Sequence, residues 1–441
     1  MQLERAKSVL FNDQMVLVYS LFLFVLIVIS LFVPIFVYAV FFLGLFYIIT
    51  TKVKNSLLLL FFLLPFAGIL KFQIGDPSFL TYLKLVFLVV FVFRNYRKSL
   101  DFTKLFFLPL LFIMSMLNSP NIIRIADIII NIVFLFFVIS IIEDTLLKKI
   151  IFIYAIGLLL ASIITLFEPR IPRMGALMRF VVHWLEDGTT TKRFSGLEND
   201  PNYYSMPVIL LLSSLLVLLK KKQIKETVFY LYAIPLSFFG ILTLSKSFII
   251  IYFLFIIAYF IVIFQINNIR ALVTIFILLV GALIVIRSTR FSALTILLNR
   301  LTSSFSSGET DINVILTGRW GIWIKYWTEI NKNLTTLLFG HGTSAGYVGG
   351  NASHSMYIEI LYHYGIIGFI LIAANILMIT FSSRNRIGHN FIYYSPIIFL
   401  LMLSAALDMI KEDKVFYYLV IAIGAIYKPN NNSKNGLTDL L

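Results

Sequence analysis

Long apolar runs, each followed by a short polar turn, recur from one end of the chain to the other. A helix needs roughly 20 apolar residues to cross the hydrocarbon layer of a bilayer, and most runs approach that length. Runs of this length favour helices over a membrane barrel. We therefore predict an all-α polytopic membrane protein with about fourteen transmembrane helices. The predicted spans are 15–33, 35–50, 56–72, 79–93, 103–118, 125–142, 150–167, 202–219, 226–243, 248–265, 271–286, 355–380, 391–407 and 415–427.

Two long polar stretches divide these spans into groups. Short loops rich in Lys and Arg alternate with other turns, and the positive-inside rule places such basic loops in the cytoplasm. Both termini are then predicted to be cytoplasmic and both long loops periplasmic. The predicted organisation is N-terminal transmembrane helices at 1–167, a periplasmic loop at 168–200, central transmembrane helices at 201–286, a large periplasmic loop at 287–353, C-terminal transmembrane helices at 354–428 and a cytoplasmic tail at 429–441.

The composition supports a membrane protein and limits its chemistry. The chain is 60% hydrophobic and 13% charged, whereas soluble domains are about 45–50% apolar and about 25% charged. The chain has no cysteine, which excludes disulfides and thiolate metal sites. The net charge of +15 is partly explained by cytoplasmic Lys and Arg, so we expect no nucleic-acid partner. Residues 1–14 contain no convincing cleavage site, and no cleavable signal is expected.

The predicted outer surface carries basic residues that the topology does not require. Basic side chains where the positive-inside rule predicts few indicate an anionic ligand. We therefore expect an anion-binding site at this surface. The residues concerned are Arg170, Arg173, Arg179, Lys192, Arg193, Lys246, Arg287, Arg290, Arg300, Arg319, Lys325 and Lys332.

The first candidate stretch reads KRFSGLENDPNYY and ends at Tyr204. Asp200 before Pro201 predicts the N-cap and first residue of the eighth span. Gly196 permits a tight turn beside Arg193. A helix N-terminus favours anions, so Arg193 is a candidate for binding a phosphate oxygen. An interfacial arginine that reaches lipid head groups explains the spacing equally well.

Two further stretches supply cations. Lys246 lies in a tight turn between apolar spans, where a lysine tends to have an anionic partner, although alone it is better interpreted as a plain turn residue. In TGRWGIWIKYW, ending at Trp327, the tryptophans recur at helical spacing and predict an amphipathic helix on the outer leaflet. Tryptophan also stacks on sugars, but an aromatic interfacial belt is the simpler interpretation. Arg319 opens this helix beside Gly318.

The second long loop ends at the start of an apolar helix. Asn351 and Ser353 are predicted N-cap residues, which places His354 at the mouth of a membrane helix. Glu359, about one turn further, is a membrane-embedded carboxylate and functional by default. His363 lies deeper and is equally well interpreted as a packing residue.

Four of these residues suit one reaction. Arg193, Lys246, Arg319 and His354 are far apart in sequence, yet the topology places all four at the outer surface. The cations can stabilise the negative charge that develops on a phosphate-type leaving group. His354 can take a proton from an attacking hydroxyl. We expect neither a metal nor another cofactor.

These stretches resemble the O-antigen polymerase (Wzy) and O-antigen ligase (WaaL) superfamily of membrane proteins. The resemblance covers roughly residues 190–370 and rests on RFSG with DPN, the SK turn at 245–246, GR at 318–319, FGHG at 339–342, and HS at 354–355 followed by two glycines. Relatives often have arginine where this chain has Lys246. Lysine keeps the charge but loses the bidentate phosphate geometry.

The resemblance implies a metal-independent, inverting glycosyltransferase with a GT-C-like fold in the bacterial inner membrane. The implied donor is a glycan on undecaprenyl pyrophosphate at the periplasmic face. A polymerase moves this glycan to a lipid-linked repeat unit, and a chain-length regulator is a further partner besides membrane lipids. Arg193 and Arg319 would hold the pyrophosphate, and His354 would act near the acceptor hydroxyl. The expected substrate contacts are Lys246, Asn202, Glu198, Asp200, Trp323, Glu359 and Tyr203.

Three alternatives stay open. An O-antigen ligase would move the glycan to lipid A-core, but about fourteen spans and the Phe/Ile-rich composition favour a polymerase. A lipid-linked sugar transporter would carry charge at mid-membrane depth and a pair of Gly/Pro-broken helices, which the sequence does not indicate. A structural membrane scaffold leaves the outer cations unexplained.

Overall fold

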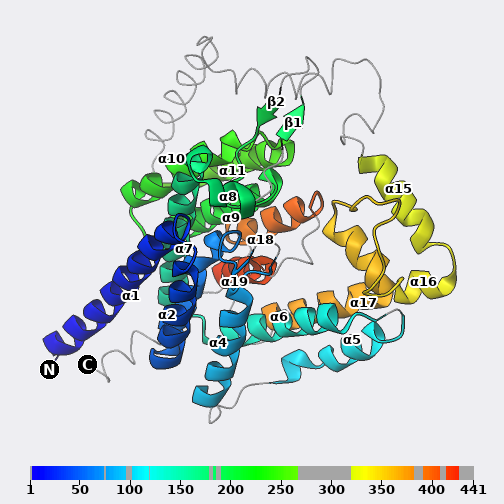
Figure 1. Ribbon diagram of the computed structural model, residues 1–441, viewed down its shortest axis with the longest axis horizontal. Coiled ribbons are helices and arrows are strands. Elements are labelled where there is room, and N and C mark those ends of the chain that lie inside the picture. Colours follow the sequence, from blue (N-terminus) through cyan, green and yellow to red (C-terminus); the bar gives the residue numbers. More distant parts are fainter. Residues whose placement is uncertain are drawn as a thin grey trace.

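The structure is a computed structural model that describes residues 2–73, 76–95, 102–118, 120–177, 182–184, 190–266, 319–381, 391–407 and 414–426. Within these ranges nearly all regular structure is helical, and the helices pack into one bundle (Figure 1). The eleventh predicted span, 271–286, lies outside the described residues. So do the tail 429–441, residues 287–318 of the large loop, and Arg179, Arg287, Arg290 and Arg300.

The N-terminal helices follow the predicted apolar runs, with breaks at prolines. The third predicted span changes from α to 3₁₀ at Pro65, and the fifth is divided just before Pro109. Proline lacks the N–H that would continue the helical bonds, so a helix restarts there. The elements are α1 (Gln2–Ser30), α2 (Phe36–Thr50), α3 (Val53–Leu63), η1 (Leu64–Phe66), α4 (Leu80–Asn95), η2 (Phe102–Leu105), α5 (Leu108–Ser115), α6 (Ile122–Ile141) and α7 (Asp144–Leu166).

The first predicted periplasmic loop adds one small exception to the otherwise helical fold. It contains η3 (Glu168–Arg170), α8 (Pro172–Leu177) and a two-stranded antiparallel hairpin, β1 (Val182–Trp184) with β2 (Thr190–Lys192). The hairpin departs from the all-α prediction. Three residues per strand are too few for a recognisable alternation of apolar and polar positions.

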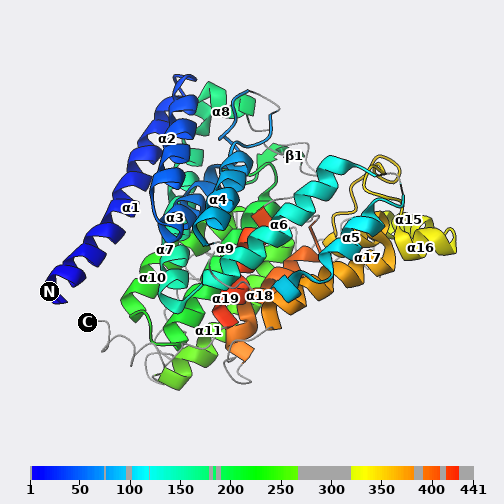
Figure 2. The same ribbon diagram turned by 90° about the horizontal axis from the view of Figure 1, so that it is seen from below.

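The remaining helices form the centre and the far end of the bundle. They are α9 (Pro201–Lys220), α10 (Glu226–Leu242), α11 (Lys246–Ile266), α15 (Arg319–Ile330), α16 (Leu334–Phe339), α17 (Met356–Phe381), α18 (Phe391–Ser404) and α19 (Lys414–Ile426). In both views α5 lies along α17, and α15 and α16 lie at the end of the molecule where α17 begins (Figures 1 and 2).

Five of the described helices are long and apolar enough to cross a membrane: α6, α7, α9, α11 and α17. Six shorter apolar helices accompany them. Large apolar side chains remain exposed on the outer helices, for example Phe42 at 60% and Phe253 at 65%. An apolar exterior of this kind is compatible with a membrane protein, because lipid tails can cover it.

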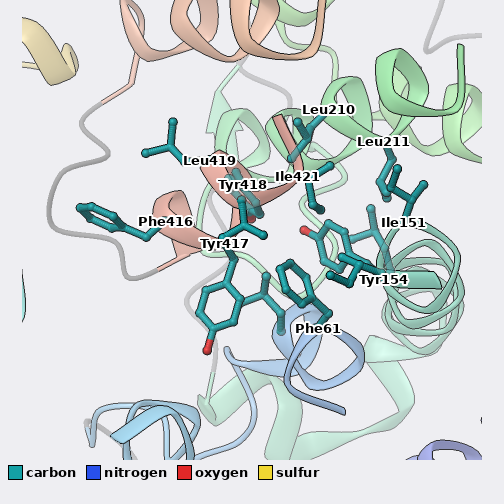
Figure 3. Packing of buried hydrophobic residues seen from close by; sticks show 14 of the residues in the cluster. Phe61, Ile151, Tyr154, Leu210, Leu211, Phe416, Tyr417, Tyr418, Leu419 and Ile421 are labelled. Carbon is teal, nitrogen blue, oxygen red and sulfur yellow. The ribbon is translucent and has the colours of Figure 1, made fainter. Parts of the chain in front are cut away.

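Helix α9 forms the centre of the bundle. Its apolar window is 89% buried, against 39% for that of α11. It packs against α10, α11, α18 and α19. Beside it, the ring of Tyr417 lies 5.2 Å from Phe61 and 4.6 Å from Phe134, measured between centroids (Figure 3). Burial of such aromatic rings fixes the neighbours of α9, and with them the position of its N-terminus.

Two ion pairs join turns that the topology predicts on the cytoplasmic side. Lys54 Nζ lies 3.0 Å from Glu143 Oε2, and Lys221 Nζ lies 3.3 Å from Asp144 Oδ1. These residues belong to turns that were all assigned to the cytoplasm, and the contacts bring them together.

Two of the predicted outer turns, the one after α5 and the loop before α17, contact each other. Asn118 Nδ2 donates to the Gly340 carbonyl at 2.9 Å, and Arg124 donates to the Thr343 carbonyl at 2.6 Å. The side of the membrane on which each group of turns lies stays a prediction.

Candidate active site

The first turn of α9 is the centre of the candidate site. Asp200 Oδ1 accepts the N–H of Asn202 at 2.6 Å, and Pro201 is the first helical residue. The predicted N-cap and N1 are therefore confirmed. The Asn202 side chain extends from this turn, and its Oδ1 accepts a hydrogen bond from Ser245 Oγ at 2.7 Å.

Arg193 is held beside this turn. The residue is only 5% exposed, and its Nε donates to the Thr243 carbonyl at 2.7 Å. Its Nη2 lies 3.4 Å from Asn202 Oδ1. The turn that follows needs Gly196, because φ is +55° and a Cβ there would lie 2.3 Å from the Tyr204 ring. The backbone at Gly196 thus carries Arg193 against the start of α9, as predicted.

Lys246 begins α11 directly after this contact. Helix α10 ends at Leu242, so the predicted tight turn is confirmed. Leu244 has a φ of +50°, which is rare for a residue other than glycine. Because Ser245 is bonded to Asn202, the adjacent half-buried Lys246 is carried to the same end of α9.

Arg319 comes to the same place from the second long loop. It is the first described residue of that loop and the first residue of α15. Burial lowers the pKa of its guanidinium, while the nearby Asp200 carboxylate and Tyr203 phenol act in the opposite direction. Both of these electrostatic neighbours belong to the start of α9, so Arg319 lies over that helix terminus.

His354 completes the cluster and has an unusual backbone. Its φ is +52°, a left-handed conformation that costs about 1–3 kcal/mol for such a residue and is found at functional sites. Burial lowers the pKa of its imidazole, and the Arg319 cation lowers it further, whereas Asp200 and Glu359 oppose this. The residue remains exposed at the surface, so solvent limits the size of the shift. The lowered pKa favours the neutral imidazole, which is the form that can accept a proton.

Residues from four segments thus meet at one helix terminus. Arg193, Lys246 and Arg319 supply positive charge, and the N-terminus of α9 adds its own partial charge. Guanidinium groups bind phosphate oxygens through paired N–H donors. The arrangement can hold an anion next to a neutral imidazole.

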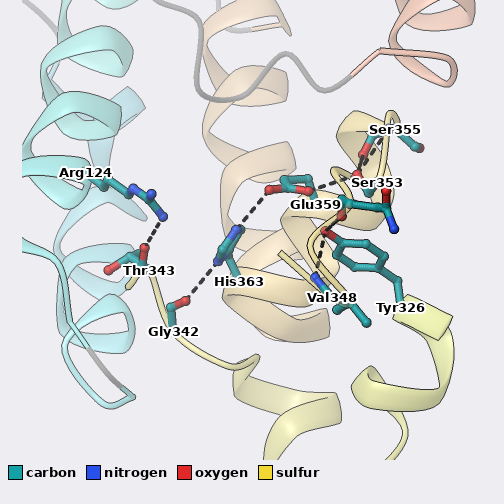
Figure 4. Close-up of polar contacts among 10 residues, drawn as sticks. Arg124, Tyr326, Gly342, Thr343, Val348, Ser353, Ser355, Glu359 and His363 are labelled. Carbon is teal, nitrogen blue, oxygen red and sulfur yellow. Dashed lines mark hydrogen bonds and ion pairs between the residues drawn. The ribbon is translucent and has the colours of Figure 1, made fainter. Parts of the chain in front are cut away.

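Below His354, a chain of buried polar groups begins α17. Ser353 Oγ donates to Glu359 Oε2 at 2.9 Å, and His363 Nε2 lies 3.0 Å from Glu359 Oε1 (Figure 4). His363 Nδ1 lies 2.9 Å from the Gly342 carbonyl oxygen. Glu359 is fully buried, and its two oxygens contact Ser353 and His363, so the expected substrate contact of this residue stays a prediction.

The predicted N-caps of this helix are wrong. Helix α17 begins at Met356, beyond both Asn351 and Ser353. Asn351 pairs with Val348 in an isolated bridge, and Ser353 is engaged by Glu359. Ser353 Oγ accepts the N–H of Ser355 at 3.2 Å, two residues before the end of the loop, because the first helical bond, from Glu359 N–H, goes to the Ser355 carbonyl.

Helix α17 is broken where two chain segments touch backbone to backbone. Gly365 has a φ of +64°, and a Cβ on it would lie 2.4 Å from the Leu338 carbonyl group. A Cβ on Gly340 would lie 2.5 Å from the His363 carbonyl carbon. The N–H of His341 donates to the Tyr362 carbonyl at 2.8 Å, which satisfies a group that the break exposes. The FGHG motif therefore serves to dock the large loop on α17.

The other predicted contacts lie around this group. Trp323 donates its indole N–H to the Ser353 carbonyl at 2.8 Å and so supports the loop before His354. Trp320 and Trp327, on the same helix, are 40% and 54% exposed. The helix is amphipathic as predicted, and its position on a leaflet stays a prediction.

Glu198 is paired with a lysine. Its carboxylate oxygens are 2.7 and 2.6 Å from Lys414 Nζ. Both residues line a cavity of about 390 Å³, as does Tyr203. Glu198 and Tyr203 therefore mark a region that adjoins the cationic group.

Sequence reasoning missed a second polar cluster. Lys84 is 1% exposed, and its Nζ donates to Asn131 Oδ1 at 2.7 Å. Asn131 lines a cavity of about 270 Å³ together with Arg124, Asp127 and other residues. Charged and amide side chains inside predicted spans were the signal that would have identified it, since such residues are costly in a membrane.

Within the described ranges, no group of three or more His, Cys, Asp or Glu side chains could hold a metal ion. No family model matches the chain, and no curated protein and no solved structure is significantly similar to it.

Proposed function

We propose that the protein is a membrane glycosyltransferase that polymerises a surface polysaccharide, in the manner of an O-antigen polymerase. The observation that carries this proposal is the convergence of Arg193, Lys246, Arg319 and His354 on the first turn of α9. Their sequence motifs resemble those of that superfamily. Four separate segments have no packing reason to bring cations to one helix terminus, whereas a pyrophosphate gives them one.

The proposed reaction uses each residue type for a distinct task. The acceptor hydroxyl attacks the anomeric carbon of the donor glycan, and the bond from that carbon to the pyrophosphate oxygen breaks with inversion. The undecaprenyl pyrophosphate leaves with the electron pair, and the cations stabilise its growing charge. The hydroxyl proton passes to His354, whose lowered pKa keeps it neutral beforehand.

The proposed function implies a particular orientation of the protein in the membrane. The chain would cross the bacterial inner membrane about fourteen times in a GT-C-like fold with both termini in the cytoplasm. The cluster would then face the periplasm. The donor and acceptor would both be glycans on undecaprenyl pyrophosphate, and a chain-length regulator would be a further partner.

Deletion of the gene in its own host tests this function. We expect lipopolysaccharide with a single repeat unit on the core and no ladder on a gel. The Arg193→Ala, Arg319→Ala and His354→Ala variants should fail to restore the ladder at normal protein levels, because each removes one of the reacting groups.

Other gel patterns would favour the alternatives. Bare core, with polymer held on the lipid carrier, would identify a ligase. Repeat units that accumulate on the cytoplasmic side would identify a transporter. An unchanged ladder would refute the assignment to this polysaccharide.

A further inference from the structure

A cavity beside Glu198 lies next to the cationic cluster and has no role in the proposed function so far. It has a volume of about 390 Å³, which falls within the roughly 300–1,000 Å³ of small-molecule sites. Its walls come from η1 and the stretch that follows it, the start of α4, α6, the stretch before α9 with the first turn of that helix, and α19. The cavity is therefore built by several elements of the bundle, and the stretch that precedes α9 links it to the candidate site.

Its position connects it directly to the cluster. Tyr203 lines the cavity and is also an electrostatic neighbour of Arg319. Asn199 lines it as well, and the next residue is Asp200, the N-cap of α9. A molecule in the cavity would thus lie beside the first turn of α9, which is also where the cations meet.

The charge of the lining argues against a phosphate. The charged residues are two lysines, Lys71 and Lys414, and three carboxylates, Asp76, Asp127 and Glu198. Their sum is 2 − 3 = −1, and Lys414 is already paired with Glu198 at 2.6 Å. An anion would meet net repulsion here, whereas the cluster across the turn is cationic.

The same lining suits a molecule with several hydroxyl groups. Carboxylate and amide oxygens accept hydrogen bonds from hydroxyls, and lysine and threonine donate to them. Asp76, Asn199 and Thr81 provide such groups on different walls. Tyr203 and Tyr417 add aromatic faces, which contact the apolar faces of sugar rings.

We infer that this cavity binds a saccharide unit of the acceptor glycan, next to the cations that hold the donor pyrophosphate. The inference rests on the proposed function, because that function supplies the saccharide. It divides the site by charge: phosphate on the Arg193 and Arg319 side, neutral sugar on the Asp76 and Asn199 side. The acceptor hydroxyl would then approach His354 from across the start of α9.

The absence of cysteine from the chain allows a direct test. A Thr81→Cys variant places one thiol in the cavity wall, and Thr328→Cys places one on the exposed side of α15. Both variants, in native membranes, are treated with a small neutral methanethiosulfonate. The labelling rate is measured alone and with the repeat-unit saccharide released from its carrier by mild acid. Undecaprenyl phosphate and inorganic pyrophosphate are tested in parallel.

We expect both thiols to react and only Cys at position 81 to be protected by the saccharide. Protection should reach about tenfold at a saccharide concentration about ten times its dissociation constant, since only free protein reacts. Neither undecaprenyl phosphate nor pyrophosphate should protect. Equal labelling with and without saccharide, or protection by the phosphate compounds instead, would overturn the inference.

The outcome is separable from that of the proposed function, because labelling needs no turnover. Polymer synthesis without protection at position 81 would overturn the cavity assignment alone. Protection in a protein that makes no polymer would support the saccharide site and refute the polymerase.

Discussion

Ser245 Oγ donates a hydrogen bond to Asn202 Oδ1 at 2.7 Å, and this bond joins two candidate stretches that lie 43 residues apart in sequence. Asn202 belongs to the first turn of α9, whereas Ser245 ends the turn before α11. The same oxygen lies 3.4 Å from Arg193 Nη2. The amide of Asn202 therefore positions the arginine relative to Lys246.

The Ser245→Ala variant should lower polymer synthesis without unfolding the protein. Loss of this hydroxyl removes one of the two contacts of Asn202 Oδ1, so the amide and the neighbouring Arg193 can shift. A displacement of a reacting group by about 1 Å can reduce a rate by about 100-fold. Ser213→Ala is the matched control, because Ser213 is equally buried on α9 but bonds only to backbone carbonyls of its own helix. Initial rates in membranes, normalised to protein level, measure the effect. Equal rates for the two variants would show that Ser245 has no positioning role.

The pKa of His354 should respond to its charged neighbours. It lies below the ordinary 6.5, so neutral imidazole persists as the pH falls through 6.5. Arg319→Gln should raise it, because a cation is removed, and Asp200→Asn should lower it, because an anion is removed. Carbethoxylation of His354, followed by mass spectrometry across pH, measures the midpoint without requiring activity. An unchanged midpoint of His354 modification in both variants would contradict the electrostatic coupling of His354 to Arg319 and Asp200.

The same shift affects stability in a definite direction. The unfolded chain binds a proton at His354 at a higher pH than the folded protein does. Stability therefore falls as the pH decreases from 6.5 towards the folded pKa, and changes no further below it.

Gly340 and Gly365 should tolerate no side chain. A Cβ at either position would lie within 2.6 Å of backbone atoms, and both residues have positive φ. Alanine at either position should cost at least about 1–3 kcal/mol from the backbone conformation alone. Gly346→Ala is the control, because an added Cβ there would meet no atom within 4 Å and its φ is not left-handed. Thermal unfolding in detergent measures the difference, and comparable melting temperatures for Gly365→Ala and Gly346→Ala would contradict it.

The buried pair of Glu359 and His363 should stabilise the protein as a unit. Removal of either partner leaves a buried polar group without one of its hydrogen bonds, which costs about 1–3 kcal/mol. The double variant should cost less than the sum of the single variants, since the two residues are coupled. Lys332 and Glu329 form an exposed control pair at 3.5 Å, where the same substitutions should cost at most about 1 kcal/mol. Additive losses at Glu359 and His363 would show that the pair is not coupled.

The sequence predicted well what depends on local pattern. The described helices follow the predicted apolar runs, because an apolar run of about 20 residues in a membrane satisfies its backbone hydrogen bonds by forming a helix. Asp200 before Pro201 is a local signal, and the structure has the predicted cap. The Trp-rich helix was found from its spacing alone.

What the sequence could not predict depends on contacts between distant segments. Ser353 was expected to cap α17, but the helix begins at Met356, and the Ser353 hydroxyl donates to the buried Glu359 from outside it. The break at Gly365 follows from the approach of Leu338, which no local pattern encodes. Lys84 of α4 donates a hydrogen bond to Asn131 of α6. Each of these features is set by packing, where tertiary contacts outweigh the preference of a residue for its immediate neighbours.

The most direct test of the central claim is synthesis by the purified protein in lipid vesicles. Undecaprenyl-pyrophosphate-linked repeat units are supplied, and products are separated by length. Arg319→Gln is compared with Lys325→Gln, which removes the same charge from an exposed position on the same helix. We predict a ladder from the unaltered protein and from Lys325→Gln, and none from Arg319→Gln or His354→Ala. A ladder from the latter two, or no extension by the unaltered protein, would contradict the account.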